Sequence, residues 1–98
     1  MQVKWLRRAL ENLEAEFEYV AADNPQAASR LVSEIENAVL NLADFPAMGR
    51  AGRVVGTREL VVPGTPYIIP YRVRGGAVEI LRVFHARRRW PTSTRDGL

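Results

Sequence analysis

A pair of adjacent glycines, Gly75-Gly76, joins two segments rich in β-branched and aromatic residues, at 67–74 and 77–85. A two-residue Gly-Gly connection between such segments favours a tight β-hairpin turn. The turn also sets the register, because residues equally distant from it face each other across the two strands. The sequence therefore predicts a hairpin in which Arg72 lies opposite Glu79.

The same register places Ile68 opposite Val83 and Pro66 opposite His85. One face is apolar, with Arg82 as its only charge, and should pack on the helices: Tyr67, Ile69, Tyr71, Val73, Val78, Ile80 and Phe84. The other face mixes charge with aliphatic side chains: Ile68, Arg72, Arg74, Glu79, Leu81, Val83 and His85. Exposed aliphatics beside charges suit a docking surface.

Pro70 interrupts the first of these strands. A proline inside a strand removes a ladder donor and usually signals an edge or a bulge. A bulge at that position would swap the faces of 67–69. The pairing of Arg72 with Glu79 and the face of His85 depend on the turn alone, so we expect them to be unaffected.

The first half of the chain has helical periodicity. Apolar residues recur every three or four positions over about 6–22 and again over roughly 25–44. Asn24 is suited to cap the second helix, and Pro25 fits its first position, where no amide hydrogen is needed. Because the connector is short, we expect an antiparallel helical hairpin.

The remaining expected elements are short: an extended segment at 3–5, a Pro- and Gly-containing loop at 45–53, a strand at 58–62 and a turn at 63–66. Three aromatic residues are assigned to core packing: Trp5, Phe17 and Phe45. Helices followed by strands predict an α+β fold, in which a short first strand and a two-helix antiparallel hairpin pack on a small, mainly antiparallel sheet. We expect one domain over 1–98, with a loose polar tail at 92–98.

Charge is divided unevenly along the chain. Residues 1–45 hold four Lys/Arg and eight Asp/Glu, whereas residues 46–98 hold ten Arg and three Asp/Glu. The absence of cysteine excludes disulfides and thiolate metal sites, and one histidine is too few for a metal centre. With no apolar run near the ~18 residues of a membrane span and no signal peptide, we expect a cytoplasmic protein without cofactor, metal or membrane contact.

Four phrases occur in a fixed order along the second half: Phe45-Pro46-x-x-Gly49-Arg50, Thr57-Arg58-Glu59-Leu60, Tyr71-Arg72-Val73, and Glu79-Ile80-Leu81-Arg82-Val83-Phe84-His85 followed by arginines and Trp90. After a short strand and two amphipathic helices, this order resembles the RelE/ParE superfamily of toxins from bacterial type II toxin–antitoxin modules. The resemblance covers about residues 2–91.

The resemblance implies one of two activities. The RelE-like branch cleaves mRNA in the ribosomal A site, whereas the ParE-like branch poisons DNA gyrase and shows no ribonuclease activity. Members of both branches are neutralised by a co-expressed antitoxin, whose N-terminal part usually binds operator DNA. This chain would therefore inhibit growth alone and reach operator DNA only through its antitoxin.

RNA cleavage by attack of the 2′-OH needs a base, an acid and cations for the developing charge. The candidate catalytic residues for this alternative are His85, Arg72 and Arg58, since histidine titrates near neutrality and arginine is a permanent cation. Arg82 could supply a further cation. Glu59 or Glu79 could serve as the base.

Other features favour binding over chemistry. RelE proper relies on several lysines and a C-terminal tyrosine, whereas this chain has only Lys4 and no tyrosine after Tyr71. The pair of Arg72 and Glu79 needs no substrate, and a capping or antitoxin-contacting role is the alternative for His85. The candidate residues for binding the target or the antitoxin are Arg82, Arg87, Arg88, Arg89 and Trp90. We favour the ParE-like branch over a ribosome-dependent endonuclease and over a non-toxic nucleic-acid-binding domain.

Overall fold

A computed structural model describes residues 1–87; the candidates Arg88, Arg89 and Trp90 and the expected tail at 92–98 lie outside this range. The chain forms, in order, β1 (Gln2–Trp5), α1 (Arg7–Ala21), α2 (Pro25–Leu40), the 3₁₀ turn η1 (Asn41–Ala43), β2 (Arg50–Ala51), β3 (Arg58–Val61), β4 (Tyr67–Arg74), β5 (Ala77–Ile80) and β6 (Phe84–His85). Neither α1 nor α2 has the length and apolar character needed to cross a bilayer.

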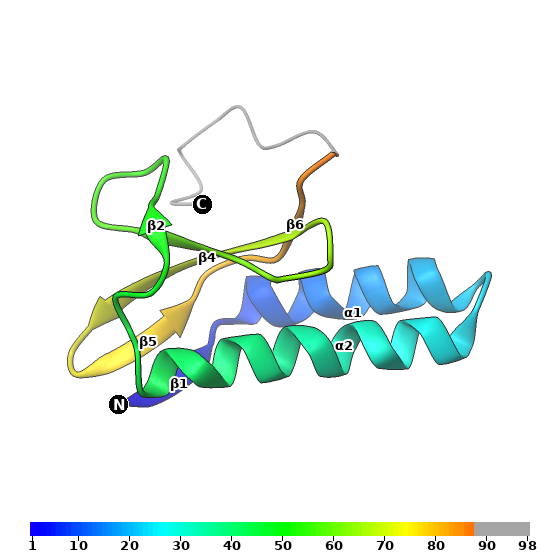
Figure 1. The fold of residues 1–98 in the computed structure, drawn as a ribbon, viewed down its shortest axis with the longest axis horizontal. Coiled ribbons are helices and arrows are strands. Elements are labelled where there is room, and N and C mark those ends of the chain that lie inside the picture. Colours follow the sequence, from blue (N-terminus) through cyan, green and yellow to red (C-terminus); the bar gives the residue numbers. More distant parts are fainter. Residues whose placement is uncertain (88–98) are drawn as a thin grey trace.

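The strands form one mixed sheet in the order β1-β5-β4-β3-β2, and β6 pairs with the start of β4. All neighbouring strands are antiparallel except β1, which runs parallel to β5. The antiparallel hairpin of α1 and α2 lies against one face of the sheet (Figure 1). The predicted α+β architecture is confirmed.

The start of α2 follows from two residues. The Asn24 side chain accepts a hydrogen bond of 3.0 Å from the backbone N–H of Ala27, and Pro25 occupies the first helical position. A side-chain cap of this kind typically contributes ~1 kcal/mol. The expected cap is thus confirmed, whereas the helix ends at Leu40, before the expected boundary at 44, and tightens into η1.

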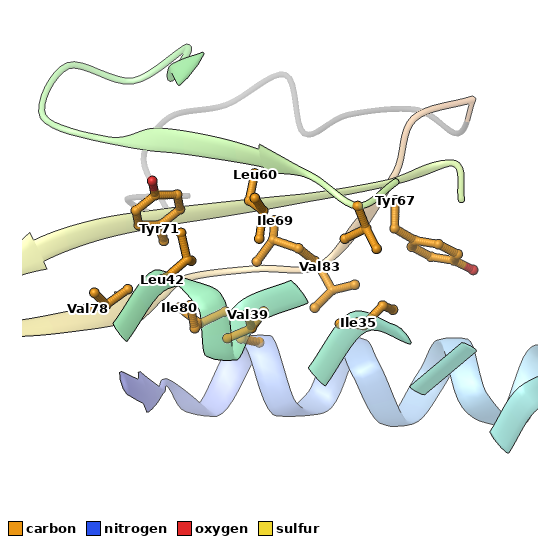
Figure 2. Close-up of a cluster of buried hydrophobic side chains, with 12 residues drawn as sticks. Ile35, Val39, Leu42, Leu60, Tyr67, Ile69, Tyr71, Val78, Ile80 and Val83 are labelled. Atoms are coloured by element: carbon orange, nitrogen blue, oxygen red, sulfur yellow. The ribbon is translucent and has the colours of Figure 1, made fainter. Parts of the chain in front are cut away.

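The core lies between α2 and the sheet. Figure 2 shows Ile35, Val39 and Leu42 facing the side chains of the strands. The strands contribute a matching set of buried residues: Leu60, Tyr67, Ile69, Tyr71, Val78, Ile80 and Val83. Each large apolar side chain removed from water contributes roughly 1.5–3 kcal/mol, so this contact is the main reason that the helices stay on the sheet.

Two of the three aromatic assignments are wrong. Trp5 packs against the core as expected, but Phe17 is 36% exposed and Phe45 is 63% exposed. Phe17 lies in the second half of α1, and the part of the helical hairpin nearest its connecting loop extends beyond the sheet (Figure 1). Phe45 follows η1, on the segment that leaves the helical layer for β2.

The predicted hairpin register holds near the turn and then fails. Arg72 lies opposite Glu79 as predicted, but His85 lies opposite Tyr67 instead of Pro66. Likewise, Ile68 lies opposite Phe84 instead of Val83. The second strand therefore contains one more residue than its partner between these two regions.

Pro70 causes this one-residue difference, although the resulting bulge lies on the opposite strand. The Leu81 N–H donates to the Pro70 carbonyl at 2.9 Å, but Pro70 has no N–H to return. Regular pairing stops at that point. Residues 81–83 lie opposite only residues 69–70, and pairing with β4 begins again at β6. The faces of residues 83–85 are swapped as a result, so the predicted face of His85 is wrong.

The predicted docking surface of exposed aliphatics is also wrong. Ile68, Leu81 and Val83 are only 6%, 5% and 4% exposed. Val83 turns into the core because of the bulge. Val73, expected to pack on the helices, is instead 47% exposed near the hairpin tip. The predicted loop at 45–53 also contains a strand, β2, which pairs with β3 at two positions.

Candidate functional site

The segment 45–50 is fixed to the sheet by the hydroxyl of Tyr71. That hydroxyl donates to the Pro46 carbonyl at 2.8 Å and accepts the Gly49 N–H at 2.8 Å. Tyr71 itself has no exposed surface. Because this buried hydroxyl both donates and accepts a hydrogen bond, the cost of removing it from water is offset. The sequence motif from Phe45 to Arg50 is therefore hydrogen-bonded to the motif that begins at Tyr71, and both motifs stabilise the fold.

Arg58, a candidate catalytic cation, holds the same segment. It lies opposite Tyr71 in the β3–β4 pair, and its Nη1 donates to the Gly49 carbonyl at 2.8 Å and to the Ala47 carbonyl at 3.3 Å. Directly paired residues point to the same face of a sheet. The Arg58 guanidinium is thus directed at the backbone of the loop that follows η1.

Glu59, a candidate base, is a buried anchor for β2. Its side chain is 4% exposed. One carboxylate oxygen accepts from Arg50 Nε at 3.3 Å and from Arg50 Nη2 at 3.1 Å. The other accepts the backbone N–H of Arg53 at 3.0 Å, with Arg53 Nε at 3.8 Å. The carboxylate therefore holds both ends of the β2 loop rather than facing a free surface.

Glu79, the second candidate base, pairs with Arg72 as the register predicts. Arg72 Nε donates to Glu79 Oε1 at 2.7 Å, and Arg74 Nε lies 3.4 Å from the same oxygen. The hydrogen bond from Arg72 is the main reason that the pKa of Glu79 is lowered; partial burial opposes this, and the charges of Arg74 and Lys4 add to it. A general base near neutral pH requires a shift in the other direction.

His85 packs against Tyr67 at the far end of β4. The two rings meet edge to face, with centroids 5.3 Å apart and an interplanar angle of 79°. His85 Nδ1 accepts the backbone N–H of Arg87 at 3.2 Å, so in this contact the ring proton resides on Nε2. Beside His85 lies a cavity of about 480 Å³, which is also lined by Thr65 and Arg87.

The structure does not bring the three candidate catalytic residues together. His85 lies opposite Tyr67, and Arg58 lies opposite Tyr71. At roughly 3.3 Å per residue, these positions are about 13 Å apart along β4. Arg72 is one residue further and points to the opposite face, because neighbouring side chains in a strand alternate.

Arg82, a candidate for target binding, joins the bulge to α1. Its Nε donates to Asn12 Oδ1 at 2.9 Å, and the same oxygen accepts the Val83 N–H at 3.1 Å. The Arg82 guanidinium also lies 4.9 Å from the ring centroid of Phe84. Arg87, by contrast, is exposed.

Sequence reasoning missed a groove between the end of α2 and β3. Its volume is about 410 Å³, and its lining includes Ala38, Met48, Val61 and Pro63. A signal was available in the sequence: Phe45 and Met48 are bulky apolar residues in a Pro- and Gly-containing loop, outside the helical and strand patterns that supply the core.

Comparisons with known proteins agree with this fold. Residues 3–90 match a sequence model of the family described as "ParE toxin of type II toxin-antitoxin system, parDE". The chain is 49% identical over 90 residues to putative toxin Y4kP of Sinorhizobium fredii, covering 92% of this chain and 93% of that protein. It is 39% identical over 87 residues to toxin RelE2 of Caulobacter vibrioides, covering 89% and 97%.

A solved structure described as "Chromosomal ParDE TA system from P. aeruginosa" superposes with a TM-score of 0.80 at 32% identity, covering 89% of this chain and 97% of that one. Sequence and fold lead to the same family, and the resemblance seen in the four phrases is confirmed. This chain belongs to the ParE toxin family of type II toxin–antitoxin systems, within the RelE/ParE superfamily.

Proposed function

We propose that this toxin inhibits growth in the cytoplasm by binding and poisoning DNA gyrase, and that a cognate antitoxin neutralises it. The proposal rests on the distance between the candidate catalytic residues in the fold. Arg58 is bonded to loop carbonyls, Arg72 to Glu79, and His85 lies on the face opposite to Arg72. Within residues 1–87 these groups do not surround a common point where a scissile phosphate could lie.

A toxin that acts by binding needs a complementary surface and no proton-transfer pair. Residues 46–98 supply ten arginines against three acidic residues, which favours an acidic or nucleic-acid-bound target. We assign the contact with the target or the antitoxin to three arginines that follow β6, Arg87, Arg88 and Arg89. Trp90 would serve as a stacking residue beside them. Arg82 would act by holding the bulge on which this segment begins.

The second candidate function is a ribosome-dependent mRNA endonuclease. It is favoured by the name RelE2 of one relative and by the cavity beside His85, which Arg87 also lines. In that mechanism His85 would act as an imidazolium, with Nδ1 protonated and released from the Arg87 N–H; it would give its Nε2 proton to the leaving 5′-oxygen and return to the neutral ring, while Arg87 would offset the phosphate charge.

Induction of this chain in bacteria without its antitoxin separates the two functions. Gyrase poisoning predicts early double-strand DNA breaks and altered plasmid supercoiling while transcripts remain intact, because stalled gyrase leaves its cleaved DNA unsealed. The measurement follows DNA breaks, plasmid topology and transcript ends in one culture, with co-expression of the antitoxin as the control. Codon-phased transcript cuts on undamaged DNA would reject gyrase and make the endonuclease the function.

A further inference from the structure

The outer face of the sheet, which points away from α1 and α2 (Figure 1), carries charged side chains across several strands. Val78 and Ile80 of β5 belong to the core beneath the helices, so Glu79 between them points to the outer face. Lys4 on β1 and Arg72 on β4 both lie opposite Glu79. Because directly paired residues share a face, these three side chains form a row across the outer face.

Arg74 extends this row towards the hairpin tip. It follows Arg72 by two positions in β4, so both side chains point to the outer face. Arg72 Nε lies 2.7 Å and Arg74 Nε 3.4 Å from the same oxygen, Glu79 Oε1. The side chain of Arg74 is 67% exposed, and that of Arg72 is 31% exposed. One carboxylate thus orients two guanidinium groups that still present surface to solvent.

A second group of charges lies on the outer face nearer to β2. Glu59 lies opposite Pro70, two positions before Arg72 in β4, and therefore points to the same face as Arg72. Its carboxylate bonds to Arg50, and Arg53 Nε lies 3.8 Å away. Arg50 is 55% exposed and Arg53 is 54% exposed, whereas Glu59 is only 4% exposed. The two arginines therefore present charge to solvent, and the carboxylate between them does not.

We call these residues the basic surface: Lys4, Arg50, Arg53, Arg72 and Arg74 with the carboxylates Glu59 and Glu79. Five cations and two carboxylates give it a net charge of +3. Within residues 1–87, the strands contain no acidic residue other than these two. The basic surface reaches from β1 to β2, which are four strand spacings apart, so it is about 19 Å wide.

Such a surface fits a polyanion better than a folded protein, because protein interfaces normally have an apolar centre. At the hairpin end of β1, β5 and β4, the outward side chains are Gln2, Lys4, Arg72, Arg74, Ala77 and Glu79. Ala77, the apolar member of this set, is 3% exposed. Arginine pairs well with phosphate oxygens. Cations spread over this width therefore match a row of phosphates.

Among nucleic acids, the basic surface favours a duplex over a single strand. Proteins bind single strands largely by stacking the bases on aromatic side chains. Phe84, which shares the outer face through its pairing with Ile68, is only 9% exposed. Duplex DNA carries one negative charge per ~1.7 Å of its axis, so a duplex lying on this surface brings several phosphates within reach of its cations.

We propose that the basic surface binds duplex DNA through its phosphates, without reading the base sequence. Operator recognition is a separate property, since it requires contacts with base edges. The proposal concerns the chain by itself and needs neither antitoxin nor gyrase. If gyrase is the target, the same contact would hold the toxin on the DNA segment that gyrase has bound.

Two arginines in different layers of the fold provide a matched test. Arg74→Gln removes one cation from the basic surface, and Arg30→Gln removes one exposed cation from α2, on the helical side of the sheet. The purified full-length chain and its variants are titrated into a fluorescein-labelled duplex of about 20 base pairs, at salt concentrations from about 50 to 200 mM. Fluorescence anisotropy gives the affinity, and each variant's melting temperature is recorded.

We expect the unmodified chain to bind with an affinity that falls steeply as salt is added. Arg74→Gln should weaken binding about tenfold at the lowest salt and reduce the slope of log affinity against log salt by about one. Arg30→Gln should bind within about twofold of the unmodified chain, because distant charges are screened. Absence of binding at the lowest salt, affinity independent of salt, or equal losses in both variants would overturn the proposal. Tighter binding of a single-stranded RNA of the same length would also overturn it.

A gain of charge keeps the proposal testable if Arg74→Gln lowers the melting temperature. Gln2 lies opposite Ala77, which lies opposite Arg74, so its side chain is at the edge of the basic surface. Gln2→Lys should tighten DNA binding about tenfold at low salt and steepen the salt dependence by about one. Gln26→Lys, at an exposed position of α2, is the control and should leave the affinity unchanged. A folding defect cannot produce tighter binding, so unchanged affinity in Gln2→Lys, or equal tightening in both variants, would overturn the proposal.

Discussion

Replacing Gly49 with alanine is expected to lower the free energy of unfolding by about 3 kcal/mol, through overpacking at a site that cannot relax. A Cβ atom built on Gly49 would lie 2.6 Å from the Tyr71 hydroxyl, 2.7 Å from Tyr71 Cε1 and 2.9 Å from the Glu59 carbonyl. Tyr71 is fully buried and the carbonyl belongs to β3, so neither can move without disturbing the core. Thermal unfolding should show a fall of about 12–24 °C for a domain of this size.

A double-mutant cycle gives this prediction its control. Tyr71→Phe alone removes the hydroxyl that bonds Pro46 and Gly49, and this should also destabilise the protein. When Tyr71→Phe is combined with Gly49→Ala, it removes the atom nearest to the new methyl group. The double variant should therefore lose less free energy of unfolding than the sum of the two single losses. Strict additivity, or a melting temperature for Gly49→Ala within ~2 °C of the unmodified chain, would show that segment 45–50 does not depend on this contact.

Removal of the Glu59 carboxylate has the second large expected effect. Glu59→Ala should lower the free energy of unfolding by about 2–3 kcal/mol. It deprives the Arg53 N–H and the Arg50 guanidinium of their acceptors. The value is below the ~3–5 kcal/mol typical of a broken buried ion pair, because both arginines are more than half exposed and regain water. Urea unfolding measures the change.

The local consequence of the same substitution separates it from a general loss of stability. Without the carboxylate, β2 and the loop after it should open, so amide hydrogen exchange should accelerate at Gly52 and Arg53 more than in β4. Glu59→Gln serves as the control, since the amide oxygen can still accept one bond. An unchanged urea midpoint and unchanged exchange in Glu59→Ala would contradict the assignment of this residue as an anchor.

The elements that sequence reasoning predicted well are those controlled by local chemistry. Gly75-Gly76 fixed the pairing of Arg72 with Glu79, and Asn24 with Pro25 fixed the start of α2. In both cases the deciding groups are within a few residues of each other. The helical hairpin followed in the same way from periodicity and a short connector.

The errors have a different origin. Pro70 lacks the N–H that would have continued the strand pairing. Whether the bulge forms on the strand of Pro70 or on the opposite strand depends on the packing around residues 81–83. The face on which His85 lies depends on which strand is bulged. β2 exists because the Glu59 side chain reaches Arg50 and Arg53, two groups placed there by a loop. Arg58 and Glu59 look like catalytic residues by type, and only their partners in space assign them to the fold.

The most direct test of action by binding rather than by acid–base chemistry is the toxicity of a double variant, His85→Asn with Arg72→Gln. Asparagine can still accept the Arg87 N–H, and glutamine can still bond Glu79, so the fold keeps its contacts while the histidine and one of the candidate cations are lost. Growth after induction without antitoxin, compared at equal protein levels, is the measurement. We predict that the double variant is as toxic as the unmodified chain; a non-toxic variant with an unchanged melting temperature and intact antitoxin binding would contradict the account.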